Sequence, residues 1–240
     1  MLSRKRVPEL MDDPKLDAEL HHHALEGLEK LNELSASASI IWSYIRLLSP
    51  RSSGQQKGKV RVLDLAAGGG DVTIAIAKLA AREQFPLEIV GADISETAMQ
   101  FAQSKVSESA LQIKFLQLDA LNDSIDEDFD AVICSLFTHH LDPPEVVALL
   151  KKMKGAARQL VIVNDLVRNE MSYALVWLAT RVFSKSPVVH FDGPVSVRAS
   201  YTFDEMEKMA LEAGLDGCRV SFLPPCRQLL VWKSSQYLSP

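Results

Sequence analysis

The spacing of hydrophobic residues changes along the chain. Apolar side chains recur at helical spacing between residues 16 and 34, and again between residues 40 and 48. We therefore predict two N-terminal helices, which make residues 1–50 a helical cap. Residues 50–58 (PRSSGQQKG) are polar and contain helix breakers, so we interpret them as a linker.

From residue 59 onward, short runs typical of buried strands alternate with helical patterns. The runs are KVRVLDLA, LEIVGADI, QIKFLQLDAL, FDAVICSLF and RQLVIVNDL. Ser95 is a suitable N-cap for the second of the intervening helices, and Pro143 suits the start of the helix before the fifth strand. This alternation predicts an α/β fold with parallel strands, right-handed crossovers and helices on both faces of the sheet.

The alternation stops after residue 168. The apolar run MSYALVWLATRVF predicts a helix, and we expect a loop in SPVVHFDGPVSVRASY, with a turn around Asp192, Gly193 and Pro194. Thr202 and Glu205 have the spacing of a capping box and begin a further helix, which Gly214 closes. The last two strands, CRVSFL and RQLLVWK, are separated by three residues and must therefore be antiparallel.

Composition limits the class of protein. The 240 residues carry a net charge of −5, and 47% of them are hydrophobic, which fits one large domain with appended elements. This net negative charge does not indicate binding to nucleic acid or to an anionic membrane. We interpret the basic run from Arg4 to Arg6 as a solvated terminus. No apolar run is long enough to span a bilayer.

Cysteine and histidine usage predicts no metal site and a cytoplasmic protein. Cys134, Cys218 and Cys226 lack paired metal-ligand spacing, and three cysteines without a secretory segment indicate reduced thiols. The histidines at 21, 22 and 23 are consecutive, so on a helix they point to different sides and cannot easily converge on one ion.

The strongest chemical signal is the glycine-rich turn DLAAGGGD after the first strand. Small residues there let a ligand approach the backbone, at the sheet edge where α/β proteins bind ligands. A dinucleotide fingerprint that starts at Gly68 would need glycine where Thr73 stands. Asp64 and Asp71 flank the turn, and carboxylates suit a cationic ligand better than phosphates.

Two further aspartates follow the next strands. Asp93 ends the second strand, where a carboxylate accepts hydrogen bonds from two ribose hydroxyls. Asp119 ends the third strand, where it would meet an adenine amino group. Either one alone is equally well explained as a cap of a turn or helix. Three aspartates at successive strand ends favour a nucleoside site.

The motifs VLDLAAGGGD, VGADIS, LQLDAL and FDAVICSLFTHHL resemble those of class I S-adenosylmethionine-dependent methyltransferases. The branch of ubiquinone and menaquinone C-methyltransferases is the most similar, and residues 1–50 and 168–201 resemble a subgroup linked to bacterial type III polyketide synthases. The resemblance implies a Rossmann-like seven-stranded mixed sheet of order 3-2-1-4-5-7-6, with the last strand antiparallel. Residues 59–240 would form the methyltransferase domain, with residues 168–201 inserted as a helical lid.

The resemblance also assigns residues to S-adenosylmethionine and to its product S-adenosylhomocysteine. The family often has glycine at the position of Ala66, but alanine is small enough to be tolerated. The cofactor residues are Asp64, Gly68 and Gly70 on the methionine side, with Ala66 and Asp71 in the same turn, Asp93 and Ile94 at the ribose and adenine, Asp119 and Ala120 at the adenine, and Ser135 and Leu136 beneath the cofactor.

Methyl transfer to a hydroxyl or acidic carbon needs a base, and three histidines are candidates. His139 and His140 follow the fourth strand, and we favour His140, although one of the two is expected only to pack or to bond the backbone. His190 is followed two residues later by Asp192, which would orient it, unless both lie solvated in a turn. Asp165, at the end of the fifth strand, would bind substrate or cap a turn.

The lid and the N-terminal helices would enclose the methyl acceptor in an apolar pocket. Its expected lining is Trp42, Asp165, Trp177, Asp192, Arg198 and Tyr201. We therefore predict methylation of an oxygen or carbon of a hydrophobic phenolic, quinone-like or polyketide-like molecule. An RNA or protein methyltransferase, and a cofactor-binding protein without methyl transfer, are the alternatives. No nucleic-acid partner or membrane insertion is expected, and a homodimer is compatible with the sequence.

Overall fold

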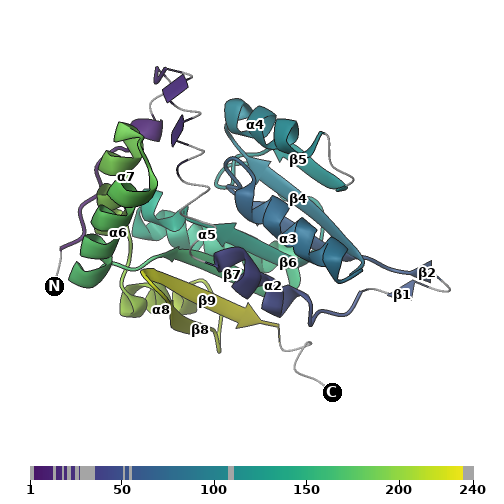
Figure 1. Cartoon of the computed structure of the whole chain (residues 1–240). Coiled ribbons are helices and arrows are strands. Elements are labelled where there is room, and N and C mark those ends of the chain that lie inside the picture. Colours follow the sequence, from purple (N-terminus) through teal and green to yellow (C-terminus); the bar gives the residue numbers. More distant parts are fainter. Residues whose placement is uncertain are drawn as a thin grey trace.

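A seven-stranded mixed sheet forms the centre of the computed structural model (Figure 1). The structure describes residues 3–12, 15–17, 19–20, 23–24, 27, 36–50, 52–53, 56–107 and 111–234. The strand order is β5-β4-β3-β6-β7-β9-β8. The strands are β3 (Val60–Leu65), β4 (Leu87–Asp93), β5 (Ile113–Gln117), β6 (Phe129–Ser135), β7 (Ala157–Leu166), β8 (Arg219–Leu223) and β9 (Arg227–Lys233).

This order is the predicted 3-2-1-4-5-7-6 arrangement, so the fold prediction is confirmed. Strands β3 to β7 pair in parallel, whereas β9 pairs antiparallel with both β7 and β8. The direction of β9 follows from its three-residue connection to β8, which is too short for a crossover.

Helices cover both faces of the sheet. On one face α2 and α3 pack on the strands through residues such as Ile41, Ile45 and Ile76, and on the other face α5 and α8 pack through residues such as Leu150 and Met206. The helices are α2 (Ser37–Ile45), α3 (Asp71–Arg82), α4 (Glu96–Val106), α5 (Pro143–Ala156), α6 (Glu170–Phe183), α7 (Pro187–Ala199) and α8 (Phe203–Glu212), with 3-10 turns η1 (Leu10–Asp12) and η2 (Thr138–His140).

The predicted helix ends are confirmed. The Ser95 side chain accepts a hydrogen bond from the Ala98 N–H at 3.2 Å, as an N-cap does. Thr202 and Glu205 form a reciprocal capping box at the start of α8. Gly214, just after α8, has a φ of +79°, which suits a glycine that ends a helix.

The prediction of a loop after α6 is wrong, because residues 187–199 form the helix α7. Ser186 caps this helix, and Pro187 occupies its first turn, where no N–H is needed. Gly193 serves packing rather than a turn: a Cβ there would lie 2.6 Å from Thr180 Cγ2 on α6. Pro194 also lies inside the helix. Residues that usually end a helix therefore occur here within one, at the place where it packs closely against α6.

The prediction of a solvated N-terminus is also wrong. The Arg4 guanidinium donates to the carbonyls of Ala199 at 2.7 Å and Leu141 at 2.6 Å, and it lies 4.2 Å from the centre of the Tyr201 ring. We call residues 3–12 the N-terminal segment. Figure 1 shows it in purple, running beside α7. Its backbone has no strand or helix period before η1, so its docking leaves no pattern in the sequence.

The remaining N-terminal predictions have mixed outcomes. The second predicted helix is present as α2, whereas the first falls largely outside the described residues. The predicted linker contains a short antiparallel pair, β1 (Ser52–Ser53) and β2 (Gln56–Lys57). Within the described ranges, no helix combines the length and apolarity needed to cross a bilayer.

Candidate functional site

The glycine-rich turn between β3 and α3 has a left-handed backbone. Ala66, Gly68 and Gly70 have φ values of +55°, +53° and +74°. The Gly68 N–H donates to Asp93 Oδ2 at 2.8 Å, which ties the turn to the end of β4. A Cβ on Gly70 would lie 2.9 Å from the Ala102 Cβ, whereas a Cβ on Gly68 would meet nothing within 4 Å. The turn is therefore rigid at Gly70 and open at Gly68.

Asp64 lies buried beneath this turn. Its Oδ2 accepts a hydrogen bond from the Thr73 hydroxyl at 2.6 Å, and its Oδ1 has no hydrogen-bond partner among the described residues. The pKa of Asp64 is raised to about 7, mainly by burial and in part by the nearby charges of Asp71 and Asp93, while the hydrogen bond from Thr73 lowers it. A cationic ligand at the turn would stabilise the ionised carboxylate.

At both of the other predicted nucleoside contacts, Asp93 and Asp119, the two carboxylate oxygens already accept hydrogen bonds from the protein. Asp93 Oδ1 accepts from the Ser95 N–H at 2.8 Å, and its neighbour Ile94 is 61% exposed, as a side chain beneath a nucleoside could be. Asp119 accepts from the Leu121 N–H at 2.8 Å and from the Asn122 side chain at 2.8 Å. Asp119 therefore has the contacts of a turn cap, the alternative considered from sequence.

The remaining predicted cofactor residues lie around the same edge. Asp71 is the first residue of α3, and Ala120 is buried. Ser135 ends β6 with a buried hydroxyl that has no hydrogen-bond partner in the part of the chain that the structure describes. Leu136 follows with a φ of +55°, and its N–H donates to the Asn164 carbonyl at 2.8 Å. The turn after β6 is thus as sharply bent as the turn after β3.

His139 is buried just after that bend and bound to Asp165 on β7. His139 Nδ1 lies 2.7 Å from Asp165 Oδ1. The other Asp165 oxygen accepts from the His139 N–H at 3.0 Å and from the Thr138 hydroxyl. Burial alone would lower the pKa of His139, but the charge and hydrogen bonds of Asp165 and Glu9 raise it to about 10. His139 is therefore protonated at neutral pH.

Glu9, from the N-terminal segment, completes this cluster, and no pattern in the sequence indicates this contact. Glu9 Oε1 lies 3.5 Å from His139 Nε2, and Glu9 Oε2 lies 3.9 Å from His140 Nε2. The Ser196 hydroxyl of α7 donates to Glu9 Oε1 at 2.5 Å. Burial would raise the pKa of Glu9, but the two histidines and Ser196 lower it, so Glu9 is a carboxylate.

His140 differs from His139 in exposure. Its side chain is 26% exposed, against 4% for His139, and the two rings lie 4.3 Å apart. Arg6 of the N-terminal segment donates to the His140 carbonyl at 2.7 Å. Of the two residues, His140 is thus the one that a substrate can reach.

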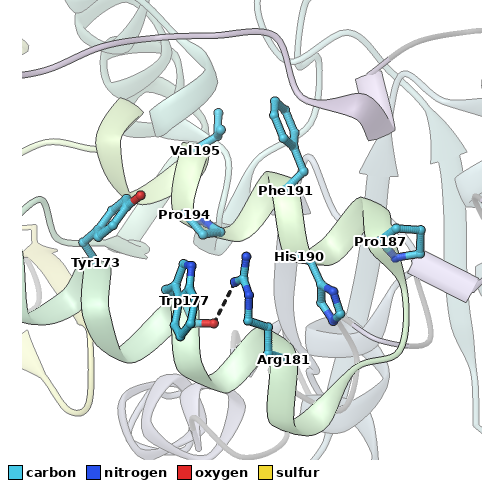
Figure 2. Close-up of a pocket in the computed structure, with 8 residues that line it drawn as sticks. All are labelled: Tyr173, Trp177, Arg181, Pro187, His190, Phe191, Pro194 and Val195. Atoms are coloured by element: carbon cyan, nitrogen blue, oxygen red, sulfur yellow. Dashed lines mark hydrogen bonds between the residues drawn. The ribbon is translucent and has the colours of Figure 1, made fainter.

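His190 lies elsewhere, in a groove of about 400 Å³ between α6 and α7 (Figure 2). Its Nε2 is 2.8 Å from the Ser184 carbonyl. Trp177 lines the same groove beneath the Arg181 guanidinium, which is 4.1 Å from the indole centre. Asp192 and Ser196 are four residues apart, so they share one face of α7, and both contact the N-terminal segment. His190 is two residues before Asp192 and therefore points from a different face of the helix. The predicted His190–Asp192 pairing does not form.

The other predicted substrate residues are dispersed. Trp42 is buried in the core, where its indole N–H donates to Glu83 at 2.9 Å. Glu83 follows the last residue of α3, so Trp42 lies at the end of this helix that is far from the glycine turn. The Asp192 carboxylate accepts from the Leu10 and Met11 N–H groups at 2.8 and 3.1 Å. The Tyr201 hydroxyl donates to the Leu141 carbonyl at 2.7 Å. Arg198 has a buried Nε that bonds to none of the described residues.

Comparison with known proteins identifies the domain. Residues 62–159 match a family described as "Methyltransferase domain". Two ubiquinone biosynthesis O-methyltransferases are similar over 160 residues: that of Methylococcus capsulatus is 29% identical and that of Alkalilimnicola ehrlichii is 31% identical. Each alignment covers 65% of this chain, and 63% and 60% of the respective relatives, so the chain spans less than two thirds of their length.

Solved structures extend the similarity to most of the chain. The plantazolicin methyltransferase BpumL in complex with S-adenosylhomocysteine superposes with a TM-score of 0.64 at 18% identity, over 93% of this chain and 91% of that one. Magnesium protoporphyrin IX methyltransferase from Synechocystis superposes with a TM-score of 0.56 at 17% identity, over 93% and 90%. The family match, the similar proteins and the strand order all agree with the methyltransferase motifs seen in the sequence around the glycine turn. Residues 62–159 therefore form a methyltransferase domain, within a fold that S-adenosylmethionine-dependent methyltransferases share.

Proposed function

We propose that this protein transfers a methyl group from S-adenosylmethionine to a hydroxyl oxygen of a hydrophobic small molecule. The observation that carries this proposal is the histidine pair at the sheet edge, with His139 buried against Asp165 and the His140 side chain 26% exposed. The two relatives from Methylococcus capsulatus and Alkalilimnicola ehrlichii are named as ubiquinone biosynthesis O-methyltransferases, which supports oxygen as the acceptor.

The edge of the sheet suits the proposed cofactor. Space lies open beyond Gly68, and Asp93 offers a carboxylate to ribose hydroxyls at the same edge. The orphaned Oδ1 of Asp64 supplies negative charge beneath the turn. When bound, the cofactor would supply an activated methyl group on a sulfonium.

The protein's part in the reaction is to orient and deprotonate the acceptor. As the acceptor oxygen bonds to the methyl carbon and the carbon–sulfur bond breaks, the hydroxyl proton must leave. His139 already carries its proton, because its pKa is about 10. We therefore assign activation of the hydroxyl to the exposed side of the pair, at His140, and the positioning of η2 to His139 and Asp165.

An apolar wall beside this edge favours a hydrophobic acceptor. Leu136, which follows β6, packs against a buried cluster that includes Val197 of α7, and Tyr173 and Val176 of α6 pack against the same cluster. Such pockets are mostly apolar with few polar groups. The acceptor we propose is a phenol, catechol or hydroxyquinone that carries an apolar substituent.

The test is incubation with labelled S-adenosylmethionine and a panel of such phenols, with the methylated position read by NMR. We expect His140→Ala to lower the turnover about 10²–10⁴-fold, the usual contribution of general acid–base groups. His190→Ala is the matched control and should retain activity. Transfer only to tRNA, protein or amines would overturn the proposal, as would an unchanged turnover in His140→Ala.

A further inference from the structure

Three potential metal ligands meet where the N-terminal segment crosses η2. Glu9, His139 and His140 each offer one ligand atom, and these atoms all lie within 4.8 Å of one another. The Glu9–His139 and Glu9–His140 separations of 3.5 and 3.9 Å are long for hydrogen bonds, which average about 2.9 Å. They approach the ligand–ligand spacing of about 3.4 Å expected around a tetrahedral zinc ion with bonds of 2.0–2.1 Å.

The surroundings of the three residues also match those of metal ligands. Metal-binding histidines nearly always donate their second ring N–H to a carboxylate or carbonyl, which fixes the ring. His139 Nδ1 makes this contact with Asp165 at 2.7 Å. Glu9 is held in turn by the Ser196 hydroxyl. Asp165 is itself fixed by the His139 and Leu166 N–H groups, so this outer layer is rigid.

We propose that Glu9, His139 and His140 form a binding site for a divalent transition metal ion of the zinc type. Two imidazoles and one carboxylate suit such an ion, and three protein ligands leave a position for water or an acceptor oxygen. Binding displaces the proton that His139 Nε2 shares with Glu9, because a metal ligand must be deprotonated.

The role of the ion follows from the position of the cluster, and this part rests on the proposed function. A hydroxyl bound to a zinc-type ion ionises much more readily than a free one. The proton would then pass to water rather than stay on His140. Glu9 would tie the N-terminal segment to the ion, so that binding of the ion also fixes this segment over η2.

The experiment titrates the full-length protein with Co²⁺, which gives visible d–d absorption bands in tetrahedral sites. The protein carries alanine at positions 21, 22 and 23, because adjacent histidines bind such ions adventitiously. We expect the bands to saturate at one equivalent and to disappear when Zn²⁺ is added. Glu9→Gln should lower the affinity for Co²⁺ by more than about 100-fold. Asp165→Asn, which removes only an outer-layer contact, should lower it by about 10–100-fold. His190→Ala should leave the affinity unchanged.

Absence of one-equivalent bands, or bands that Glu9→Gln leaves unchanged, would overturn the site. If Glu9→Gln does not fold, anomalous diffraction from Zn²⁺-soaked crystals decides: a peak must lie between the three ligands. Methyl-transfer assays on chelator-treated protein separate the two proposals. Transfer without metal binding overturns the site and leaves the proposed function standing. Metal binding without transfer to any hydroxyl acceptor would overturn the proposed function and leave the metal site standing.

Discussion

Gly70 is constrained both by its backbone and by its neighbours. Its φ of +74° is left-handed, which costs other residues about 1–2 kcal/mol, and a Cβ would lie 2.9 Å from the Ala102 Cβ. Overpacking adds about 1–3 kcal/mol, so we expect Gly70→Ala to lower the free energy of unfolding by about 2–5 kcal/mol. Urea denaturation without cofactor measures this.

Gly68→Ala is the matched control, because Gly68 shares the left-handed backbone but has open space around its Cβ. It should cost only the backbone contribution of about 1–2 kcal/mol. Equal losses for the two variants would show that the contact with Ala102 is not limiting.

Asp64 makes cofactor binding depend on pH. Its pKa is raised to about 7 in the folded protein, mainly by burial, so below pH 7 it is largely protonated. The fold is therefore less favoured as pH rises from about 4 to about 7, because the unfolded chain releases this proton first. A bound sulfonium favours the carboxylate. We expect S-adenosylmethionine affinity to increase from pH 6 to pH 7.5, with proton release below pH 7.

Calorimetry in two buffers of different ionisation enthalpy measures the protons released. Asp64→Asn, which has the same shape but cannot ionise, should bind with a flatter pH profile and release fewer protons. Proton uptake in the unmodified protein would contradict the prediction.

At the scale of single residues, sequence predicts backbone roles better than side-chain partners. The glycines of the turn could be predicted because a left-handed backbone needs them. Asp119 could not be assigned, since a turn cap and an adenine contact require the same residue type at the same place. Glu9 was missed because its partners lie about 130 residues away and no local pattern marks the contact.

Among the elements, the N-terminal segment docks through side-chain and backbone hydrogen bonds to η2, α7 and the residues around them. Asp192 binds it by accepting from the Leu10 and Met11 N–H groups. Asp192→Asn replaces a charged acceptor with a neutral one, and hydrogen bonds to charged groups contribute about 1.5–3 kcal/mol. We expect amide exchange at Leu10 and Met11 to accelerate at least tenfold in the variant, measured by hydrogen–deuterium exchange.

Asp17→Asn is the control, because Asp17 also accepts from backbone N–H groups, those of Glu19 and Leu20, but at an exposed site. It should leave exchange at Leu10 and Met11 unchanged. If Asp192→Asn has no effect there either, other contacts of the segment, such as those of Arg4, Arg6 and Glu9, are sufficient to hold it.

Over the whole molecule, the sheet was predictable because each strand is a distinct apolar run and the last connection is too short to be anything but a hairpin. Helix α7 was not, because Gly193 and Pro194 resemble a turn unless the close contact with Thr180 is known. Breaker residues that serve long-range packing carry the same sequence signal as breakers that end an element.

The cofactor should stabilise the molecule as a whole, because the proposed site joins the turns after β3 and β4. A ligand that binds only the folded state at 100 times its Kd adds about 2.7 kcal/mol. For a chain of 240 residues this corresponds to an increase in Tm of about 5–11 °C. Differential scanning fluorimetry with S-adenosylhomocysteine should show this increase, whereas NAD at the same concentration should show none, since Thr73 occupies the third glycine position of a dinucleotide turn. A comparable shift with NAD would mean that the turn accepts a different nucleotide from the one proposed.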